Sequence, residues 1–334
     1  MTVRVGVLGV GNIGQDHIRR LSRVLCGASV VALSDIDSAR ASTVAGGVTG
    51  ARVFDTGQEL IRADDVEAVL VASWGPTHAD FVLAAIEMGK SVFCEKPLAP
   101  TIAACLHIVD AEVAYGRRLV QVGFMRRYDD GYRAMKTAIT SGALGTPLLI
   151  HCAHRNASVP PNVTSDMLIT DSAIHEIDLV RWLLDEEIVA ARVLKPRRSG
   201  RVGELQDPQL VILETVTGVV VDVEVFVNCG YGYDIRCEIV GESASVSLDD
   251  PSGVILRRDG QRAGRVPGDW RERFARAYDA ELQAWLDSVA ASTVTGPSAW
   301  DGYAATAVAD ACLTALESGE RAAVQLAARP ALYG

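Results

Sequence analysis

The sequence predicts an α/β protein: a doubly wound parallel sheet at the N-terminal end, followed by an α+β domain built on a large open, mostly antiparallel sheet. Two observations support this fold class. Before Gly123, short apolar runs alternate with helical patterns, which is typical of right-handed βαβ units. After Gly123, the segments become strand-like and alternate apolar with polar residues. We therefore predict domains at residues 1–123 and 124–334.

Composition and charge argue against several classes of protein. The 334 residues are 49% hydrophobic and 22% charged, which is typical of a globular chain rather than a disordered one. The net charge of −10 argues against nucleic acid as a partner, because phosphate binding requires a basic surface. The seven cysteines are odd in number and form no CxxC, which argues against a disulfide framework and against a structural zinc site.

The N-terminus and the apolar runs favour a cytoplasmic protein. Met1 is followed at once by a strand-like run, not by a basic segment and a long apolar run, so we expect no signal peptide. No apolar stretch approaches the length that spans a membrane, and scattered free thiols fit a reducing compartment. We therefore expect a cytoplasmic location and no membrane partner.

A glycine-rich turn after the first strand predicts a dinucleotide site. Residues 3–8 indicate a strand buried on both faces, residues 16–24 continue as a helix, and Gly-Val-Gly-Asn-Ile-Gly lies between them. The first glycine permits a tight turn, the second lets the backbone approach a pyrophosphate, and the third lets the helix pack closely. The phosphates would lie at the helix N-terminus, where unpaired N–H groups favour anions. The cofactor-binding residues predicted in this turn are Gly9, Gly11, Asn12, Ile13 and Gly14.

Asp35 ends the second predicted strand, residues 30–35, at about the 20-residue spacing of the dinucleotide fingerprint. A carboxylate at this position binds the ribose hydroxyls of NAD and disfavours the additional phosphate of NADP. The alternative is an ordinary turn acid, and the nearby Arg40 could instead serve a 2′-phosphate. With the strand and the glycines in place, Asp35 favours NAD as the cofactor.

The loop after the strand at residues 68–72 supplies further candidates. Ligands of open α/β sheets bind beyond the carboxyl ends of the strands, so Ser73, Trp74 and His78 are placed to line the cofactor. His78 could equally be an N-terminal residue of the helix at about 79–88, with no contact to the cofactor.

The next strand, residues 91–94, leads into Glu-Lys-Pro. The proline holds Lys96 in an extended or turn geometry, and the Lys96–Pro97 bond can be cis in such a turn. The alternative is a surface lysine in a loop. The helix at 101–115 and the strand at 119–122 complete a unit of six strands.

The remaining sequence predicts one sheet and a final helical region. Strands are expected at residues 148–154, 190–194, 209–215, 219–226, 234–241 and 244–248. Helices are expected up to about residue 140, over 270–291 and over 302–316. Four side chains of the last region are expected to pack in the core or between subunits: Phe274, Leu282, Trp285 and Leu286.

Residues 170–184 indicate a helix, because their apolar residues recur with a period near 3.6. The segment carries Asp171 and His175 at positions i and i+4, which lie on one face of an α-helix. The carboxylate can accept a hydrogen bond from one imidazole nitrogen and leave the other to take a proton from a substrate. The alternative is that Asp171 is only the N-cap of the helix.

Taken together, these motifs resemble those of the Gfo/Idh/MocA oxidoreductase family and, within it, of the inositol 2-dehydrogenases. The segments that carry the resemblance span nearly the whole chain: Gly9-Val-Gly-Asn-Ile-Gly14, Ser73-Trp-Gly-Pro-Thr-His78, Glu95-Lys-Pro97, Gly123-Phe-Met-Arg-Arg-Tyr128, His154-Arg-Asn156, Asp171 with His175-Glu-Ile-Asp178, Tyr231-Gly-Tyr-Asp234 and Gly296-Pro-Ser-Ala-Trp-Asp-Gly302.

The resemblance implies a Rossmann domain that binds NAD and a C-terminal domain that binds substrate and makes the subunit contacts of a homotetramer through its sheets. It implies one catalytic group and no metal. The catalytic residues would be Lys96, Asp171 and His175, the substrate contacts Arg126, His154, Asn156 and Tyr233, and Glu95 would join the cofactor-binding residues.

The activity implied by the resemblance is NAD-dependent oxidation of a cyclic polyol, myo-inositol to 2-keto-myo-inositol. His175 would take the hydroxyl proton, Asp171 would orient His175, and Lys96 would stabilise the developing alkoxide. The alternative substrates are scyllo-inositol, an aminocyclitol precursor and a sugar such as glucose.

Three other classes of protein compete with this interpretation. A zinc alcohol dehydrogenase needs Cys and His ligands, and the helix carries His-Glu-Ile-Asp instead of HExxH. A non-catalytic dinucleotide sensor would not need the three catalytic residues intact. An NAD-dependent glycosidase of the same fold would recycle its cofactor, so net formation of NADH from a free polyol separates a dehydrogenase from both.

Overall fold

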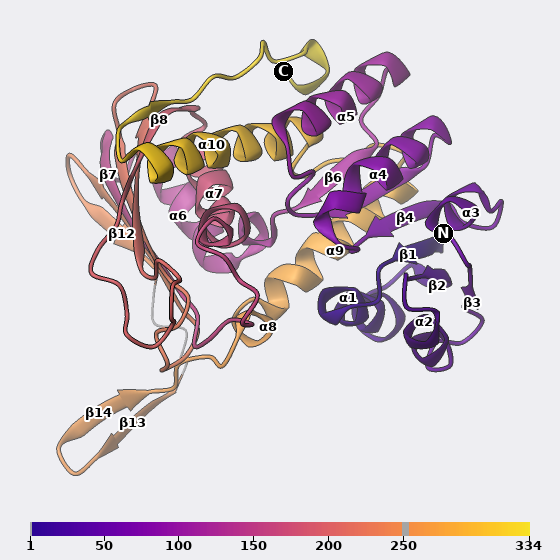
Figure 1. The fold of residues 1–334 in the computed structure, drawn as a ribbon, viewed down its shortest axis with the longest axis horizontal. Coiled ribbons are helices and arrows are strands. Elements are labelled where there is room, and N and C mark those ends of the chain that lie inside the picture. The colour runs from indigo at the N-terminus through magenta and orange to yellow at the C-terminus, as the bar shows by residue number, and fades with distance from the viewer. Residues whose placement is uncertain (1, 249–253) are drawn as a thin grey trace. The chain divides into compact units, whose positions relative to one another are not determined.

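The computed structural model describes residues 2–248 and 254–334 and divides into two compact units (Figure 1). The first unit comprises residues 1–124, 278–306 and 327–334, and the second comprises 125–277 and 307–326. The chain first leaves the first unit next to the predicted boundary at residue 123, and later returns to that unit twice. A division into residues 1–123 and 124–334 follows chain order and does not include these returns.

The first unit contains the six-stranded parallel sheet that the alternation of strands and helices predicted. The strands lie in the order β3-β2-β1-β4-β5-β6, and every neighbouring pair is parallel. The order reverses between β1 and β4, which is where open α/β sheets bind their ligands. The bounds are β1 Val3–Leu8, β2 Ala28–Ser34, β3 Arg52–Val53, β4 Ala68–Val71, β5 Ser91–Glu95 and β6 Val120–Gly123.

Local signals explain most helices of this unit. Thr56 and Glu59 form a capping box at the start of α3, and Thr101 caps α5, which ends at Gly116 in the left-handed conformation. The position of the sixth strand, β3, was not identified from the sequence, because it has only two residues and both are exposed. The helices are α1 Asn12–Arg23, α2 Ser38–Ala45, α3 Gly57–Arg62, α4 His78–Glu87 and α5 Ile102–Tyr115.

The core of the first unit includes a helix from the far end of the chain. The helix α9 (Ala275–Ala290) places Leu282, Trp285 and Leu286 in one buried cluster with strand residues of the parallel sheet, among them Val5. These three side chains are core residues, as predicted. Their burial removes a large apolar area from water, which explains why residues 278–306 belong to the first unit.

The second unit is built on a seven-stranded sheet in the order β12-β11-β7-β10-β9-β8-β15. The strands β7 and β10 are parallel neighbours, and the other neighbouring pairs are antiparallel, which confirms a mostly antiparallel sheet. All six predicted strands are present. The bounds are β7 Pro147–Arg155, β8 Ile188–Leu194, β9 Gln209–Thr215, β10 Val220–Phe226, β11 Asp234–Gly241, β12 Ser245–Ser247 and β15 Ala322–Ala323.

Three short strands were not predicted. The strand β15 has two residues, and the hairpin of β13 (Ile255–Arg258) and β14 (Gln261–Gly264) is mostly exposed, so neither shows an apolar pattern. The hairpin projects away from the seven-stranded sheet (Figure 1). The final helices are α8 (Trp270–Arg273), α9 and α10 (Ala299–Ser318). Within residues 2–248 and 254–334, no helix combines the length and apolar character of a membrane span.

The two faces of the seven-stranded sheet differ. The helices α6 (Asp130–Thr140) and α7 (Ile174–Leu184) lie on one face, which we call the covered face (Figure 1). Along β7, buried Ile150, Cys152 and His154 point to this face, because side chains alternate along a strand. The intervening His151 points to the opposite face, which we call the open face.

The helix predicted over residues 170–184 is not a regular α-helix throughout. Residues Leu168–Ala173 form a π-helix, and α7 begins only at Ile174. Asp171 therefore lies inside a π-helical turn, and its alternative interpretation as an N-cap was wrong. The widened turn also changes how Asp171 and His175 are aligned along the helix. In a π-turn the hydrogen bonds run from i to i+5, so residues i and i+4 are less closely aligned than in an α-helix.

Candidate active site

The glycine turn of the first unit has the geometry that its spacing predicted. Gly9 has a φ of +88°, and a Cβ added there would lie 2.5 Å from the Cα of Ser73. A Cβ on Gly14 would lie 2.0 Å from the carbonyl oxygen of Gly9. Gly11, the N-cap of α1, would place a Cβ in open space. The turn is therefore closed on one side and leaves room for a pyrophosphate beside the helix N-terminus.

Asp35 is tied to this turn through its carboxylate. One oxygen accepts the N–H of Val10 at 2.7 Å, and the other accepts the N–H of Asp37 at 2.9 Å and the guanidinium of Arg40 at 2.7 Å. Burial alone would raise the pKa of Asp35, but the two backbone N–H groups and Arg40 together hold the pKa below its ordinary value. The carboxylate is therefore ionised, and Arg40 is its partner.

The loop after β4 is fixed by His78, whose ring is buried. Its Nδ1 lies 2.8 Å from the carbonyl oxygen of Pro97, and its Nε2 lies 3.0 Å from that of Ser73. His78 is the first residue of α4 (His78–Glu87), and its ring contacts the backbone of both loops. Burial lowers the pKa of this imidazole, while its two carbonyl contacts act in the opposite direction. The ring joins the loops after β4 and β5. In the same loop, Trp74 is 77% exposed.

Glu95 lies at the end of β5 and is also engaged within the first unit. One carboxylate oxygen lies 2.6 Å from Nε2 of the buried His17, and the other accepts the backbone N–H of Lys96 at 3.3 Å. The Lys96–Pro97 bond is cis. His17 was not predicted as a partner of Glu95, because the two residues lie 78 positions apart in the chain.

The second unit buries a cluster of three polar side chains, which we call the Arg–His–Glu cluster: Arg126, His154 and Glu176. The Arg126 guanidinium pairs with the Glu176 carboxylate, and its Nη2 lies 3.2 Å from Nδ1 of His154. That Nδ1 lies 3.1 and 3.2 Å from the two carboxylate oxygens of Glu176. Arg126 and Glu176 are each only 1% exposed.

The cluster carries its charges inside the protein. Burial alone would raise the pKa of Glu176, but Arg126 and His154 hold the pKa below its ordinary value, so the carboxylate is ionised. The same pairing raises the pKa of Arg126 despite its burial. Burial raises the pKa of the neighbouring Tyr233 to about 12, so its phenol keeps its proton.

The cluster contains two predicted substrate contacts, Arg126 and His154, and the rings of a third, Tyr233, and of the predicted catalytic His175 lie beside it. The Tyr233 ring meets the His154 ring edge to face, with centroids 5.9 Å apart, and the His175 ring lies 6.4 Å from that of His154. Asn156 follows at the end of β7, and its side-chain oxygen is buried without a hydrogen-bond partner in the described part of the chain. Asp171 belongs to the same unit, whereas Lys96 belongs to the first unit.

Glu176 was missed as a site residue. It follows His175 directly, and nothing in its own neighbourhood distinguishes it from a surface glutamate on a helix. A second acid of the same helix, Asp178, pairs with Arg127, with one bond of 2.9 Å to the Nε of that arginine. The adjacent Arg126 and Arg127 therefore both form ion pairs with acids of α7.

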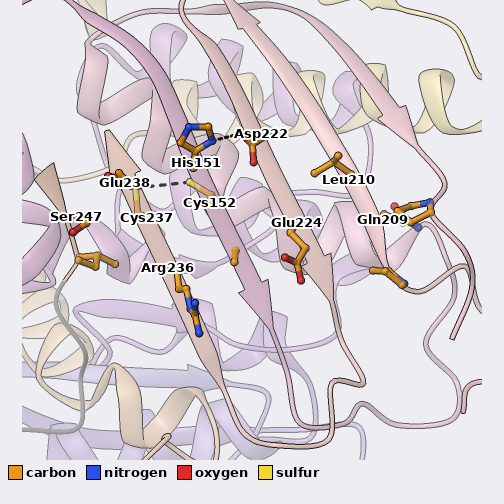
Figure 2. Close-up of a pocket in the computed structure, with 14 residues that line it drawn as sticks. His151, Cys152, Gln209, Leu210, Asp222, Glu224, Arg236, Cys237, Glu238 and Ser247 are labelled. Carbon is orange, nitrogen blue, oxygen red and sulfur yellow. Dashed lines mark hydrogen bonds and ion pairs between the residues drawn. The ribbon is translucent and has the colours of Figure 1, made fainter. Parts of the chain in front are cut away.

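The open face of the same sheet carries a hollow of about 590 Å³. Figure 2 shows His151 and Asp222 pointing toward each other from neighbouring strands, and the two form an ion pair when the histidine is protonated. Arg236 and Glu238 lie nearby on β11 (Figure 2). None of the predicted site residues lines this hollow, so it is separate from the Arg–His–Glu cluster on the covered face.

Two family models match the chain in succession. Residues 3–124 match the NAD-binding Rossmann fold of the Gfo/Idh/MocA oxidoreductase family, and residues 136–326 match the C-terminal alpha/beta domain of that family.

Relatives match over the full length. The chain is 60% identical to inositol 2-dehydrogenase 3 of Saccharopolyspora erythraea, with 100% of this chain and 99% of the relative covered. It is 56% identical to the inositol 2-dehydrogenase of Burkholderia multivorans, again covering 100% and 99%.

Among solved structures, myo-inositol dehydrogenase from Lactobacillus casei, in complex with NAD(H) and myo-inositol, superposes with a TM-score of 0.97 at 40% identity, with both chains fully (100%) covered. The scyllo-inositol dehydrogenase of the same organism has a TM-score of 0.89 at 24% identity, covering 97% of this chain and 99% of the other, and so shows a common fold.

Proposed function

Because the chain belongs to the Gfo/Idh/MocA oxidoreductase family, we propose that it is an NAD-dependent dehydrogenase that oxidises myo-inositol to 2-keto-myo-inositol. The observation that carries this proposal is the match, at 40% identity over the full chain, to an enzyme whose structure holds NAD(H) and myo-inositol. The relatives at 60% and 56% identity are likewise inositol 2-dehydrogenases. NAD, when bound, supplies the nicotinamide carbon that accepts hydride from the substrate.

We propose that the catalytic group is Lys96, Asp171 and His175. His175 takes the proton of the reacting hydroxyl, and Asp171 orients the imidazole and stabilises its protonated form. Lys96 donates a hydrogen bond to the same oxygen as it gains alkoxide character. The hydrogen bond from the Lys96 backbone N–H to the Glu95 carboxylate supports a fixed position for this lysine.

The proposed substrate contacts are hydrogen-bonding side chains: Arg126, His154, Asn156 and Tyr233. A cyclic polyol carries no charge, so its affinity must come from paired hydroxyls. The buried side-chain oxygen of Asn156 supports this role, because it has no hydrogen-bond partner among residues 2–248 and 254–334, and a buried acceptor is stable only when a donor reaches it.

For the cofactor, we propose that the following residues contact NAD: Gly9, Gly11, Asn12, Ile13, Gly14, Asp35, Ser73 and Trp74. The open space at Gly11 and the exposure of Trp74 support direct contact. His78 and Glu95 are predicted to act at the same site, and their bonds to Ser73, Pro97, His17 and Lys96 support a role in holding its loops.

A substrate screen tests the proposed reaction. The purified protein is incubated with NAD or NADP and, in turn, with myo-inositol, scyllo-inositol, glucose and an aminocyclitol, and the absorbance of reduced cofactor is followed. We expect the highest kcat/KM with myo-inositol and NAD. A clear preference for scyllo-inositol or an aminocyclitol would overturn the substrate, and no net NADH from any polyol would favour a sensor or a glycosidase.

We also propose a cytoplasmic homotetramer that forms through the open faces of the seven-stranded sheets. The free cysteines support the location. The open face supports the assembly, because Leu149 and Val220 remain 40% and 37% exposed on it beside charged side chains.

Sedimentation equilibrium of a matched pair of variants tests the assembly. We expect Leu149→Asp to lower the oligomeric state. Val113→Asp is the control, because Val113 is 42% exposed on α5 in the first unit. A monomeric unmutated protein, or equal behaviour of the two variants, would contradict this interface.

A further inference from the structure

We infer that Glu176 is a positioning residue of the substrate site: its carboxylate holds His154 in the tautomer that carries its proton on Nδ1, so that Nε2 accepts a hydrogen bond from a substrate hydroxyl. The inference rests on the proposed role of His154 as a substrate contact. It adds a residue that touches neither the substrate nor the cofactor and acts through its partners.

The geometry around Nδ1 decides the tautomer. Nδ1 lies 3.1 and 3.2 Å from the two oxygens of Glu176, and 3.2 Å from Nη2 of Arg126. A carboxylate can only accept a hydrogen bond, and a guanidinium can only donate one. A proton on Nδ1 therefore satisfies Glu176, whereas a bare Nδ1 would satisfy Arg126.

The partners of each group favour the first arrangement. Arg126 has another acceptor, since its Nη1 already donates to Oε1 of Glu176. Oε2 of Glu176 has only His154 as a hydrogen-bond donor within the part of the chain that the structure describes. Without a proton on Nδ1, a buried carboxylate oxygen would face the imidazole lone pair and no donor, which is the more costly outcome.

The consequence concerns the other nitrogen of the ring. Within the described residues, every hydrogen bond of the His154 ring is made by Nδ1. A neutral imidazole with its proton on Nδ1 presents Nε2 as an acceptor, and the hydroxyls of a polyol are donors. Glu176 therefore makes Nε2 of His154 an acceptor for hydrogen bonds from substrate hydroxyls. An outer carboxylate fixes the tautomer of a metal-binding histidine in the same way.

Glu176 also orders the other partner. Its carboxylate holds the guanidinium of Arg126, so that a single buried acid sets two of the proposed substrate contacts. The ring of His175 lies 6.4 Å from that of His154, so this positioning acts beside the proposed proton acceptor. A side chain at this place must be an acceptor on both oxygens, which glutamine cannot be.

The first test uses the unmutated enzyme. Histidine is labelled with ¹⁵N, and proton–nitrogen correlations report which ring nitrogen of each histidine carries hydrogen, with His154→Gln identifying the signals of His154. We expect His154 to carry its proton on Nδ1 above neutral pH. A proton on Nε2 would overturn the inference.

The second test is Glu176→Gln, whose amide donates a hydrogen bond to Nδ1 and so favours the opposite tautomer. We expect KM for myo-inositol to rise about 10- to 100-fold, more than kcat falls, with KM for NAD unchanged. The matched control is Glu187→Gln, which removes the partner of Arg181 beyond the end of the same helix, where bonds of 2.6 and 2.8 Å join the two side chains.

The outcomes separate this inference from the proposed site. If His154→Gln raises KM for myo-inositol but Glu176→Gln leaves it and the tautomer unchanged, the site stands and the positioning role is wrong. If His154→Gln leaves KM unchanged, the proposed substrate contact fails, and the inference fails with it. A merely structural Glu176 would lower the melting temperature without moving the proton of His154.

Discussion

Asp35 in the first unit and Glu176 in the second are both ionised carboxylates held by an arginine, yet they are built in different ways. Asp35 receives two backbone N–H groups, from Val10 and Asp37, and its arginine partner is 42% exposed. Among the described residues, Glu176 accepts hydrogen bonds only from side chains, and both Arg126 and His154 are buried with it.

The difference shows how the two units make their binding sites. Around Asp35, backbone N–H groups of the turns that follow β1 and β2 supply most of the donors, so the site follows from the local fold. Glu176 lies on α7, and its donors are side chains of η2 (Met125–Tyr128) and β7, which only the tertiary structure brings together. We therefore expect substitutions to affect the two units differently.

The largest expected effect separates chemistry from cofactor binding. We expect Lys96→Ala and His175→Ala each to lower kcat by about 10²- to 10⁴-fold, while NAD still binds, because neither side chain is proposed to hold the pyrophosphate. Asp171→Asn should also be strongly impaired, because it disturbs the imidazole tautomer. Steady-state kinetics and NAD titration by protein fluorescence measure the two quantities, and near-normal turnover of Lys96→Ala would refute the assignment.

The next effect concerns stability. Glu176→Gln leaves the Arg126 guanidinium buried without its counter-charge, so we expect the free energy of unfolding to fall by about 3 kcal/mol. Glu187→Gln removes an acid that is one-third exposed and should cost less than about 1 kcal/mol. Thermal and urea unfolding of both variants give the comparison. Equal losses would show that burial does not distinguish the two pairs.

The pH dependence of this difference follows from the lowered pKa of Glu176. A carboxyl whose pKa is lower in the folded state contributes stability above its ordinary pKa of 4.5, and this contribution is lost as the pH falls through the folded-state pKa. We therefore expect the gap in unfolding midpoint between the unmutated protein and Glu176→Gln to be full at pH 7 and to shrink below about pH 4.5. A gap that stays constant on acidification would contradict this account.

The same contrast explains what the sequence could and could not predict. The glycine turn and Asp35 were predictable, because the spacing of the glycines and the end of a buried strand determine their geometry. Helix ends such as those at Thr101 and Gly116 carry their own chemical signals. The strand β3 carries none, since two exposed residues form no pattern.

In the second unit, alternation along each strand predicted which face a side chain occupies, but not which strands are neighbours. The parallel pairing of β7 with β10 depends on the path of the chain between them, which no local pattern records. The π-turn at Leu168–Ala173 was missed because its apolar spacing is also that of an α-helix. Arg126 and His154 were predicted as substrate contacts only through a family resemblance, and Glu176 was not predicted as a site residue.

A smaller effect tests the first unit. We expect a preference for NAD over NADP in kcat/KM, because the ionised Asp35, in its proposed role, would repel the 2′-phosphate. Asp35→Ala should narrow the preference by about tenfold or more, and it also frees Arg40, which can then bind that phosphate. In the double variant Asp35→Ala with Arg40→Ala, Arg40 can no longer bind the 2′-phosphate, so kcat/KM with NADP should be lower than in Asp35→Ala alone. Equal kcat/KM with both cofactors in the unmutated enzyme would contradict the proposed role of Asp35.

The smallest expected effect concerns the choice among inositols. A site that pairs each substrate hydroxyl leaves its own polar groups unpaired when an epimer misplaces one, which lowers kcat/KM by roughly tenfold or more per hydroxyl. Tyr233→Phe removes a phenol that keeps its proton and can donate, and Asn156→Ala removes a buried acceptor that has no other partner among the described residues. We expect each variant to reduce the ratio of kcat/KM between myo-inositol and scyllo-inositol while KM for NAD stays constant. Because both side chains belong to the second unit, an equal loss of NAD affinity would show that the two units do not divide the work as their construction indicates.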